Sequence, residues 1–173
     1  MSDRFAHAVR LDRIRDGERL DLVADEAERA AVAKRLRLGR IDRFDAHAAL
    51  TRDGHLVRVR GRLVAAVEQS CVITGEPVPA HLDEPFDIVF MPAPDDSKPD
   101  EEVELAPEDC DVVFYEGGAI DLGGAIADTL ALALGPYPRS AGAEVALKEA
   151  GVMTEAEASP FAVLAKLRTR DDS

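Results

Sequence analysis

Few side chains in this chain are of the kinds that bind metals or act as nucleophiles. Cys71-Val72-Ile73-Thr74 has the first half of a C-x-x-C metal motif, but Thr74 stands where the second thiol would be. Structural zinc requires four sulfur or imidazole ligands. The remaining candidates are scattered and lack H-x3-5-H spacing: Cys110, His7, His47, His55 and His81. We therefore predict no metal and no cofactor.

Covalent catalysis is a second chemistry to consider, because Cys71 could act as a nucleophile if a base removed its proton. His81 is the only candidate base nearby in the sequence, and the competing interpretation is a buried, unreactive thiol at a strand end. Asp121-Leu122-Gly123-Gly124 lacks the lysine and the spacing of a phosphate-binding loop, so its glycines are expected to serve a turn and close packing. We find no Ser-His-Asp arrangement and no H-E-x-x-H motif. The sequence thus predicts a protein that is not an enzyme.

Arg58, Arg60 and Arg62 are candidates for contact with a nucleic acid. Alternate residues of a strand project from one face about 7 Å apart, which is close to the spacing of successive phosphates. Nearby basic residues could extend this surface: Lys34, Arg35, Arg37, Arg40 and Arg43. The competing interpretation is a solvated helix and sheet face, or a face that the chain's own acidic loop neutralises.

Acidic residues gather in a different part of the chain, which has a formal net charge of −13. They could imitate a nucleic-acid backbone and hold a basic protein, or they could keep a loop soluble. The residues proposed for protein binding are Asp95, Asp96, Asp100, Glu101, Glu102 and Glu104.

A hairpin formed by residues 55–67 and 78–91 is the centre of the predicted fold. Both strands alternate apolar and polar residues, and Thr74-Gly75-Glu76-Pro77 between them supplies turn chemistry. The inward side chains are Val57, Val59, Leu63, Ala65 and Val67, then Val78, Ala80, Leu82, Phe86, Ile88 and Phe90. A strand over residues 41–51 joins the hairpin through the Asp53-Gly54 turn. The result is an antiparallel meander, with further strands expected near residues 5–11, 20–23 and 112–115.

Two helices are predicted to cover this sheet. Asp25 and Glu28 have the spacing of a capping box for a helix over residues 25–38, which Gly39 is expected to end. Asp121 is expected to cap a second helix over residues 121–134. We predict a single α+β domain over residues 1–139 with a mobile acidic loop at 93–111, followed by a flexible arm over 140–173 with a short amphipathic helix.

The sequence predicts neither a membrane span nor a signal peptide. No apolar run approaches the length of a transmembrane helix, and the N-terminus lacks a basic region followed by an apolar one. A cytoplasmic protein with no membrane contact is expected.

Several stretches of the chain, in order, resemble the YceD family, named for large ribosomal RNA subunit accumulation. They are residues 71–78, residues 84–86, residues 120–123 with the helix that follows, and Pro136-Tyr137-Pro138-Arg139. The motif residues are Cys71, Thr74, Glu76, Pro77, Asp121, Leu122 and Gly123. The resemblance runs across residues 5–167.

The resemblance implies a bacterial factor in large-subunit biogenesis that supports accumulation of 23S rRNA and has no established enzymatic activity. Implied partners are 23S rRNA or its precursor, and basic ribosomal proteins could join them. The alternative is an acidic module that holds a basic ribosomal protein without touching RNA. Many relatives carry C-x-x-C at the hairpin and more cysteines after the long helix, a pattern that suggests metal binding. Here Thr74 replaces the second cysteine and residues 140–158 contain none, as in the cysteine-poor, proteobacterial form.

Overall fold

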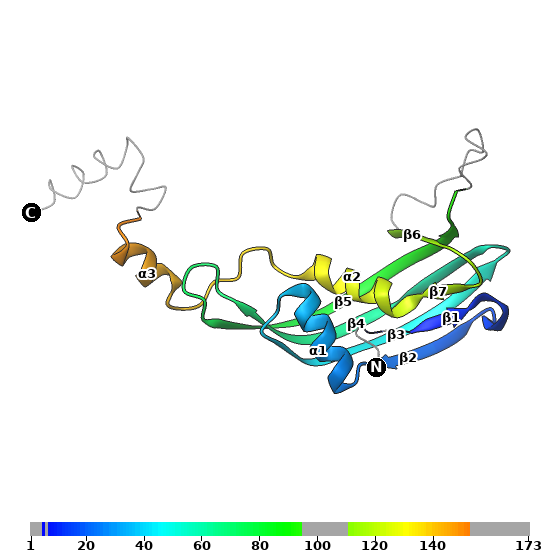
Figure 1. The fold of residues 1–173 in the computed structure, drawn as a ribbon, viewed down its shortest axis with the longest axis horizontal. Coiled ribbons are helices and arrows are strands. Elements are labelled where there is room, and N and C mark those ends of the chain that lie inside the picture. The colour runs from blue at the N-terminus through cyan, green and yellow to red at the C-terminus, as the bar shows by residue number, and fades with distance from the viewer. Residues whose placement is uncertain (1–4, 6, 95–110, 153–173) are drawn as a thin grey trace, which may run out of the picture. The chain divides into compact units, whose positions relative to one another are not determined.

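The computed structural model describes residues 5, 7–94 and 111–152 (Figure 1). The chain divides into two units by its internal packing: unit 1 comprises residues 1–69 and 79–136, and unit 2 comprises residues 70–78 and 137–173. The fold is α+β with mostly antiparallel strands, as the sequence predicts. Within the described ranges, no helix has both the length and the apolar character needed to span a bilayer.

Unit 1 is built on a five-stranded sheet in the order β2-β3-β4-β5-β6. The strands are β2 (Glu18–Val23), β3 (Arg40–Asp53), β4 (Leu56–Ser70), β5 (Pro77–Pro92) and β6 (Asp111–Tyr115). β2 and β4 both pair antiparallel with β3, whereas β6 pairs parallel with β5. The β3–β4 and β4–β5 hairpins confirm the predicted meander. A parallel neighbour needs a long connection, and residues 93–110 supply the length.

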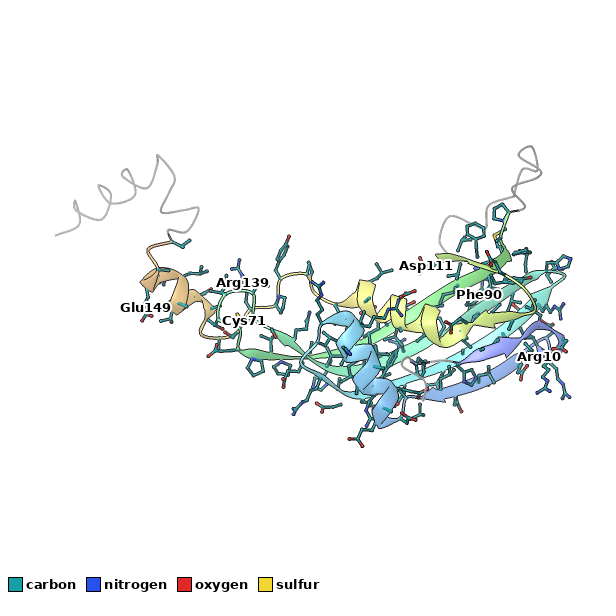
Figure 2. All side chains as sticks on the ribbon, in the orientation of Figure 1. Arg10, Cys71, Phe90, Asp111, Arg139 and Glu149 are labelled. Carbon is teal, nitrogen blue, oxygen red and sulfur yellow. The ribbon has the colours of Figure 1, made fainter. Side chains whose placement is uncertain are left out.

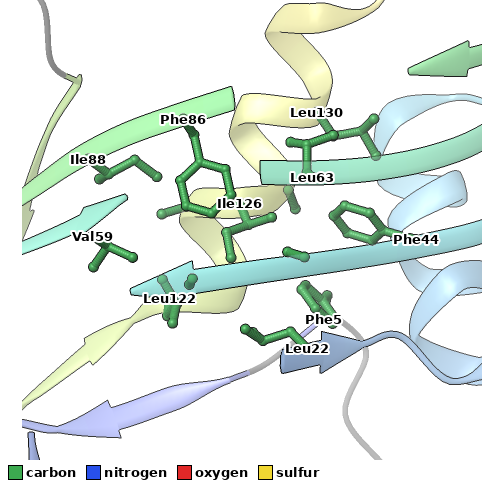
Figure 3. Close-up of a cluster of buried hydrophobic side chains, with 14 of the residues drawn as sticks. Phe5, Leu22, Phe44, Val59, Leu63, Phe86, Ile88, Leu122, Ile126 and Leu130 are labelled. Atoms are coloured by element: carbon green, nitrogen blue, oxygen red, sulfur yellow. The ribbon is translucent and has the colours of Figure 1, made fainter. Parts of the chain in front are cut away.

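One face of this sheet is buried because its strands alternate apolar and polar residues. Val57, Val59 and Leu63 of β4 have no exposed surface, and Phe86 and Ile88 of β5 join them in the core (Figure 3). Gly61 faces the same side. A Cβ atom at this position would overlap the Phe86 ring and the carbonyl of His47, so the strand needs glycine here.

Helices α1 (Glu26–Leu36) and α2 (Leu122–Ala133) cover the buried face (Figures 1 and 3). Leu122, Ile126 and Leu130 of α2 are fully buried at the three- and four-residue spacing expected of an amphipathic helix. The core is therefore a layer of helix and sheet side chains, and no described helix of unit 1 covers the opposite, open face of the sheet.

The predicted capping box of α1 is present: the Asp25 carboxylate accepts from the amide of Glu28, and the Glu28 carboxylate accepts from the amide of Asp25. The predicted end at Gly39 is wrong. The helix stops at Arg37, which adopts a left-handed conformation with φ 56°, and the amide of Leu38 returns to the carbonyl of Ala33 at 2.9 Å. Gly39 instead donates to the carbonyl of Glu68 at 2.8 Å.

A two-stranded sheet of β1 (Ala8–Arg10) and β7 (Ala119–Asp121) lies next to the start of α2. β1 is followed by a 3-10 turn at Leu11–Arg13. The carbonyl of His7 accepts from the amide of Leu122 at 3.0 Å. A Cβ atom on Gly123 would lie 2.7 Å from the amide nitrogen of His7 and would also overlap the carbonyl of Phe5. Gly123 therefore lets the helix approach the N-terminal chain closely.

Unit 2 combines the connection between β4 and β5 with the chain after Pro136. Its helix α3 (Ala143–Glu149) lies inside the segment that the sequence suggests is a flexible arm. The helix is short and has one buried residue, Ala143, so its apolar pattern is too weak to predict it from the sequence.

Replacing Gly123 with alanine should destabilise unit 1, although alanine favours helix by about 1 kcal/mol over glycine. The methyl group would have to displace the backbone of Phe5 and His7, and such overpacking costs about 1–3 kcal/mol. Chemical denaturation measures the effect. Gly118→Ala is the matched control, because a Cβ there meets nothing within 4 Å. Equal stability of the two variants would contradict the close-approach explanation.

Candidate functional site

The arginine ladder, by which we mean Arg58, Arg60 and Arg62, lies on the open face of the sheet. These residues alternate along β4 with the buried Val57 and Val59 and the half-buried Gly61, so all three arginines point away from the core. This is the shared face that their spacing predicts. Arg60 and Arg62 have side chains more than half exposed, whereas Arg58 is 31% exposed.

Two aspartates of β5 hold the ladder. Arg58 donates to both carboxylate oxygens of Asp87, at 2.8 and 2.6 Å, and Arg60 donates to the same carboxylate at 3.0 Å. Arg62 pairs with Asp83. The hydrogen bond from Arg58 lowers the pKa of Asp87 most; burial opposes this, and the bond from Arg60 lowers the pKa further. The ladder is therefore partly neutralised by the neighbouring strand. Sequence reasoning names the acidic loop as one possible source of neutralising charge and does not consider Asp83 or Asp87.

A cross-strand row shows the same mixing of charge on the open face. Asp21 of β2 pairs in register with His47 of β3, which pairs with Arg62 of β4. The Asp21 carboxylate lies 2.6 Å from Nδ1 of His47, and Arg62 reaches Asp83 of β5. Negative and positive groups thus follow one another across four strands, which lowers the attraction of this face for a polyanion.

The second group of predicted basic residues lies at the end of α1 and the start of β3. Three of the five have acidic partners: Arg35 pairs with Asp128, Arg40 with Asp42 and Glu68, and Arg43 with Asp45. Lys34 and Arg37 are exposed and have no acidic group within 4.0 Å among the described residues. Their charges remain available to an outside anion, although cations at this place also stabilise the helix C-terminus.

A groove of about 480 Å³ lies between α1 and the first residues of β3. Lys34, Arg29 and Arg40 line it together with Glu26 and Asp42. The Arg29 guanidinium donates to the carbonyl of Ala24 at 2.7 Å, a neutral acceptor that leaves its charge uncompensated. We call Arg29, Lys34 and Arg37 the α1 cations.

The acidic residues proposed for protein binding lie outside the described residues. They are Asp95, Asp96, Asp100, Glu101, Glu102 and Glu104.

Unit 2 contains the family motif at the hairpin, where Cys71 lies (Figure 2). Its polar groups form one network that we call the hairpin cluster: Cys71, Thr74, Glu76 and Ser140. The Cys71 sulfur accepts from the amides of Thr74 at 3.4 Å and Ser140 at 3.3 Å. One Glu76 carboxylate oxygen accepts from the hydroxyls of Ser140, at 2.6 Å, and Thr74, at 2.9 Å. The cluster therefore joins the turn to the chain after Pro136.

These hydrogen bonds change the acidity of both ionisable groups. Burial raises the pKa of the Cys71 thiol, but the hydrogen bonds from Ser140 and Thr74 outweigh burial and lower it to about 6. Hydrogen bonds from Ser140 and then Thr74 lower the pKa of Glu76. Both groups are thus stabilised in their charged forms.

The donor set of the hairpin cluster does not fit the metal that the family resemblance implies. Cys71 is its only thiol, and the Glu76 carboxylate already accepts two hydroxyl hydrogen bonds. Among the described residues, no three His, Cys, Asp or Glu side chains gather where they could hold a metal ion. His81, the candidate base for Cys71, makes no hydrogen bond to it; the thiol is 4% exposed.

The helix motif of the family has a structural explanation. Asp121 caps α2 by accepting from the amide of Gly124 at 3.0 Å, Leu122 is fully buried, and Gly123 allows close packing. Sequence reasoning missed three residues that contact the candidate site residues: Asp83, Asp87 and Ser140. The two aspartates alternate with the predicted inward residues Leu82 and Phe86, so the strand pattern places them on the ladder's face; no local signal identifies Ser140.

A family model described as Large ribosomal RNA subunit accumulation protein YceD matches residues 59–168 of the chain. The match includes the ladder residues Arg60 and Arg62, the hairpin cluster and the helix motif. No curated protein and no solved structure matched the chain.

Acid should loosen the hairpin cluster. Because the folded pKa values of Cys71 and Glu76 are lowered, each charged form adds stability above its ordinary pKa, 9.0 for the thiol and 4.5 for the carboxyl. The contribution of the Cys71 thiolate to folding stability is lost as pH falls from 9.0 through about 6. The contribution of the Glu76 carboxylate to folding stability is lost below pH 4.5. Amide chemical shifts of Thr74 and Ser140 should follow both steps. Shifts that stay constant from pH 9 to pH 3 would contradict the network.

Proposed function

Since the chain belongs to the YceD family of large ribosomal RNA subunit accumulation proteins, we propose that it supports accumulation of 23S rRNA without catalysing a reaction. In this role it binds precursor RNA, alone or with basic ribosomal proteins, and protects it until the large subunit has assembled. The observation that supports RNA contact most directly is the group of α1 cations, whose charges have no acidic partner among the described residues.

We place the first RNA contact at Lys34 and Arg37. Both are exposed, both lie at the C-terminal end of α1, and the groove beside them is lined by Arg29 and Arg40. A phosphate can approach these cations without displacing a carboxylate. At physiological salt the screening length is about 8 Å, so a local cationic surface acts even on a chain with a net charge of −13.

The arginine ladder contributes to RNA binding in a second step. Phosphates must replace Asp87 and Asp83 as its partners, because Arg58, Arg60 and Arg62 are already paired. The half-buried Arg58–Asp87 pair has two aligned hydrogen bonds and is the hardest to exchange. The ladder alone is therefore a weaker RNA-binding surface than its spacing suggests.

The alternative is an acidic module that holds a basic ribosomal protein without direct RNA contact. The net charge of −13 favours it, as do the twelve acidic and one basic residue between positions 95 and 128. In this case deletion of residues 95–109 should release the bound protein, and the α1 cations should not matter.

Lys34→Gln/Arg37→Gln should lower crosslinking of the chain to 23S precursor in cells. In vitro, loss of about two phosphate contacts should make the plot of log affinity against log salt less steep by about 2. The matched control is Arg10→Gln/Arg43→Gln, which removes the same charge from residues held by Asp12 and Asp45. A similar loss of RNA crosslinking in both variants would show that RNA binding depends only on the net charge of the protein. Unchanged RNA crosslinking in Lys34→Gln/Arg37→Gln would exclude the α1 cations as the contact.

A further inference from the structure

Unit 2 contains two turns that hydrogen bonds bring into contact. Residues 71–75 close with a hydrogen bond from the amide of Gly75 to the carbonyl of Cys71 at 2.9 Å, and residues 140–143 close from Ala143 to Ser140 at 3.1 Å. Each turn thus has a first and a fourth position, Cys71 with Thr74 and Ser140 with Ala143. Two pairs separated by two residues are the usual ligand spacing of a closed zinc site.

Hydrogen bonds join the two turns directly. The amide of Val72 donates to the carbonyl of Pro138 at 3.0 Å, and the amide of Ser140 donates to the Cys71 sulfur. The hydroxyl oxygens of Thr74 and Ser140 lie 3.1 Å apart. Three of the four ligand positions are therefore in mutual contact, although only one of them carries a thiol.

Glu76 and Ala143 complete the arrangement. The Glu76 carboxylate accepts from both hydroxyls, and a Cβ atom on Gly142 would lie 3.3 Å from its Oε2, so the second turn packs against this charge. Ala143, at the fourth position, is fully buried. An anionic acceptor thus lies at the junction of the two turns, and the fourth position of the second turn is a buried apolar residue.

We propose that the hairpin cluster replaces a structural metal ion: its hydrogen bonds hold the two turns of unit 2 in the arrangement that four ligands around one metal would impose. The unit folds without metal, and positions 74, 140 and 143 lie where thiols would complete a tetrahedral site with Cys71. This inference concerns the construction of unit 2 and does not depend on the proposed function.

Thr74→Cys/Ser140→Cys/Ala143→Cys in the full chain, with Cys110→Ser to remove the other thiol, tests the geometry. Titration with Co²⁺ should show one ion per chain with the visible spectrum of tetrahedral thiolate ligation, and Zn²⁺ should displace it. The control Val72→Cys/Ile73→Cys/Val145→Cys puts the same number of thiols at exposed positions of the same segments. We expect the designed set to bind Co²⁺ tighter by at least on the order of a hundredfold. Equal affinities would overturn the proposal.

A cysteine at the buried position 143 could disturb folding, so Thr74→Cys/Ser140→Cys is a second variant that leaves Ala143 in place. It should bind one Co²⁺ through three thiolates, more weakly than the full set but more tightly than Val72→Cys/Ile73→Cys. Equal binding by these two variants would also overturn the proposal.

The natural chain tests the other half of the inference. Protein without a tag should retain no zinc after purification, and chelator should leave amide exchange in residues 71–76 and 138–143 unchanged. Glu76→Gln/Ser140→Ala should speed exchange in these segments at least tenfold, whereas Glu144→Gln should not. One zinc per chain that resists chelation, or a double variant with unchanged exchange, would contradict a hydrogen-bonded replacement.

Discussion

Burial of one face of the five-stranded sheet is the constraint on which the rest of unit 1 depends. Val57, Val59 and Leu63 of β4 are fully buried, and each such side chain contributes roughly 1.5–3 kcal/mol relative to an exposed one. Successive side chains of a strand point to opposite faces of the sheet. Burial of one face of β4 therefore places Arg58, Arg60 and Arg62 on the open face. A shift of one residue in β4 would exchange core and arginines, so the same register fixes both the stability of the protein and the position of its candidate RNA-binding residues.

On the open face, ion pairs determine which arginines can bind an anion. β5 places Asp83 and Asp87 beside the ladder, and the half-buried Arg58–Asp87 pair accepts no phosphate until it opens. The α1 cations differ from the ladder, since Lys34 and Arg37 have no acidic group within 4.0 Å among the described residues. We infer that the basic residues fall into two groups. The α1 cations can bind an anion directly, whereas the arginines of the ladder must first lose their aspartate partners. This division explains how a chain with a net charge of −13 could approach RNA.

Local chemistry in the sequence was sufficient to predict much of this structure. Alternation located the core residues of β4 and β5, and the capping box located the start of α1. The end of α1 was misplaced because an arginine, rather than the available glycine, takes the left-handed position. Asp83 and Asp87 could have been assigned to the face of the ladder from alternation, but their pairing with particular arginines depends on the β4–β5 register, which the length of the connection leaves open. Ser140 could not be found at all, because 69 residues separate it from the sulfur that it contacts.

The most direct test of this account is the RNA affinity of Asp83→Asn/Asp87→Asn, measured across a range of salt concentrations with a 23S precursor fragment. If Asp83 and Asp87 prevent the ladder from binding phosphates, the variant should bind RNA more tightly. Its plot of log affinity against log salt should steepen by about 2 to 3, because three arginines gain phosphate partners. Glu84→Gln/Glu116→Gln removes the same charge from exposed residues that hold no arginine of the ladder and should change the slope little. An Asp83→Asn/Asp87→Asn slope equal to that of this control would contradict the claim that ion pairing on the open face decides which cations meet RNA.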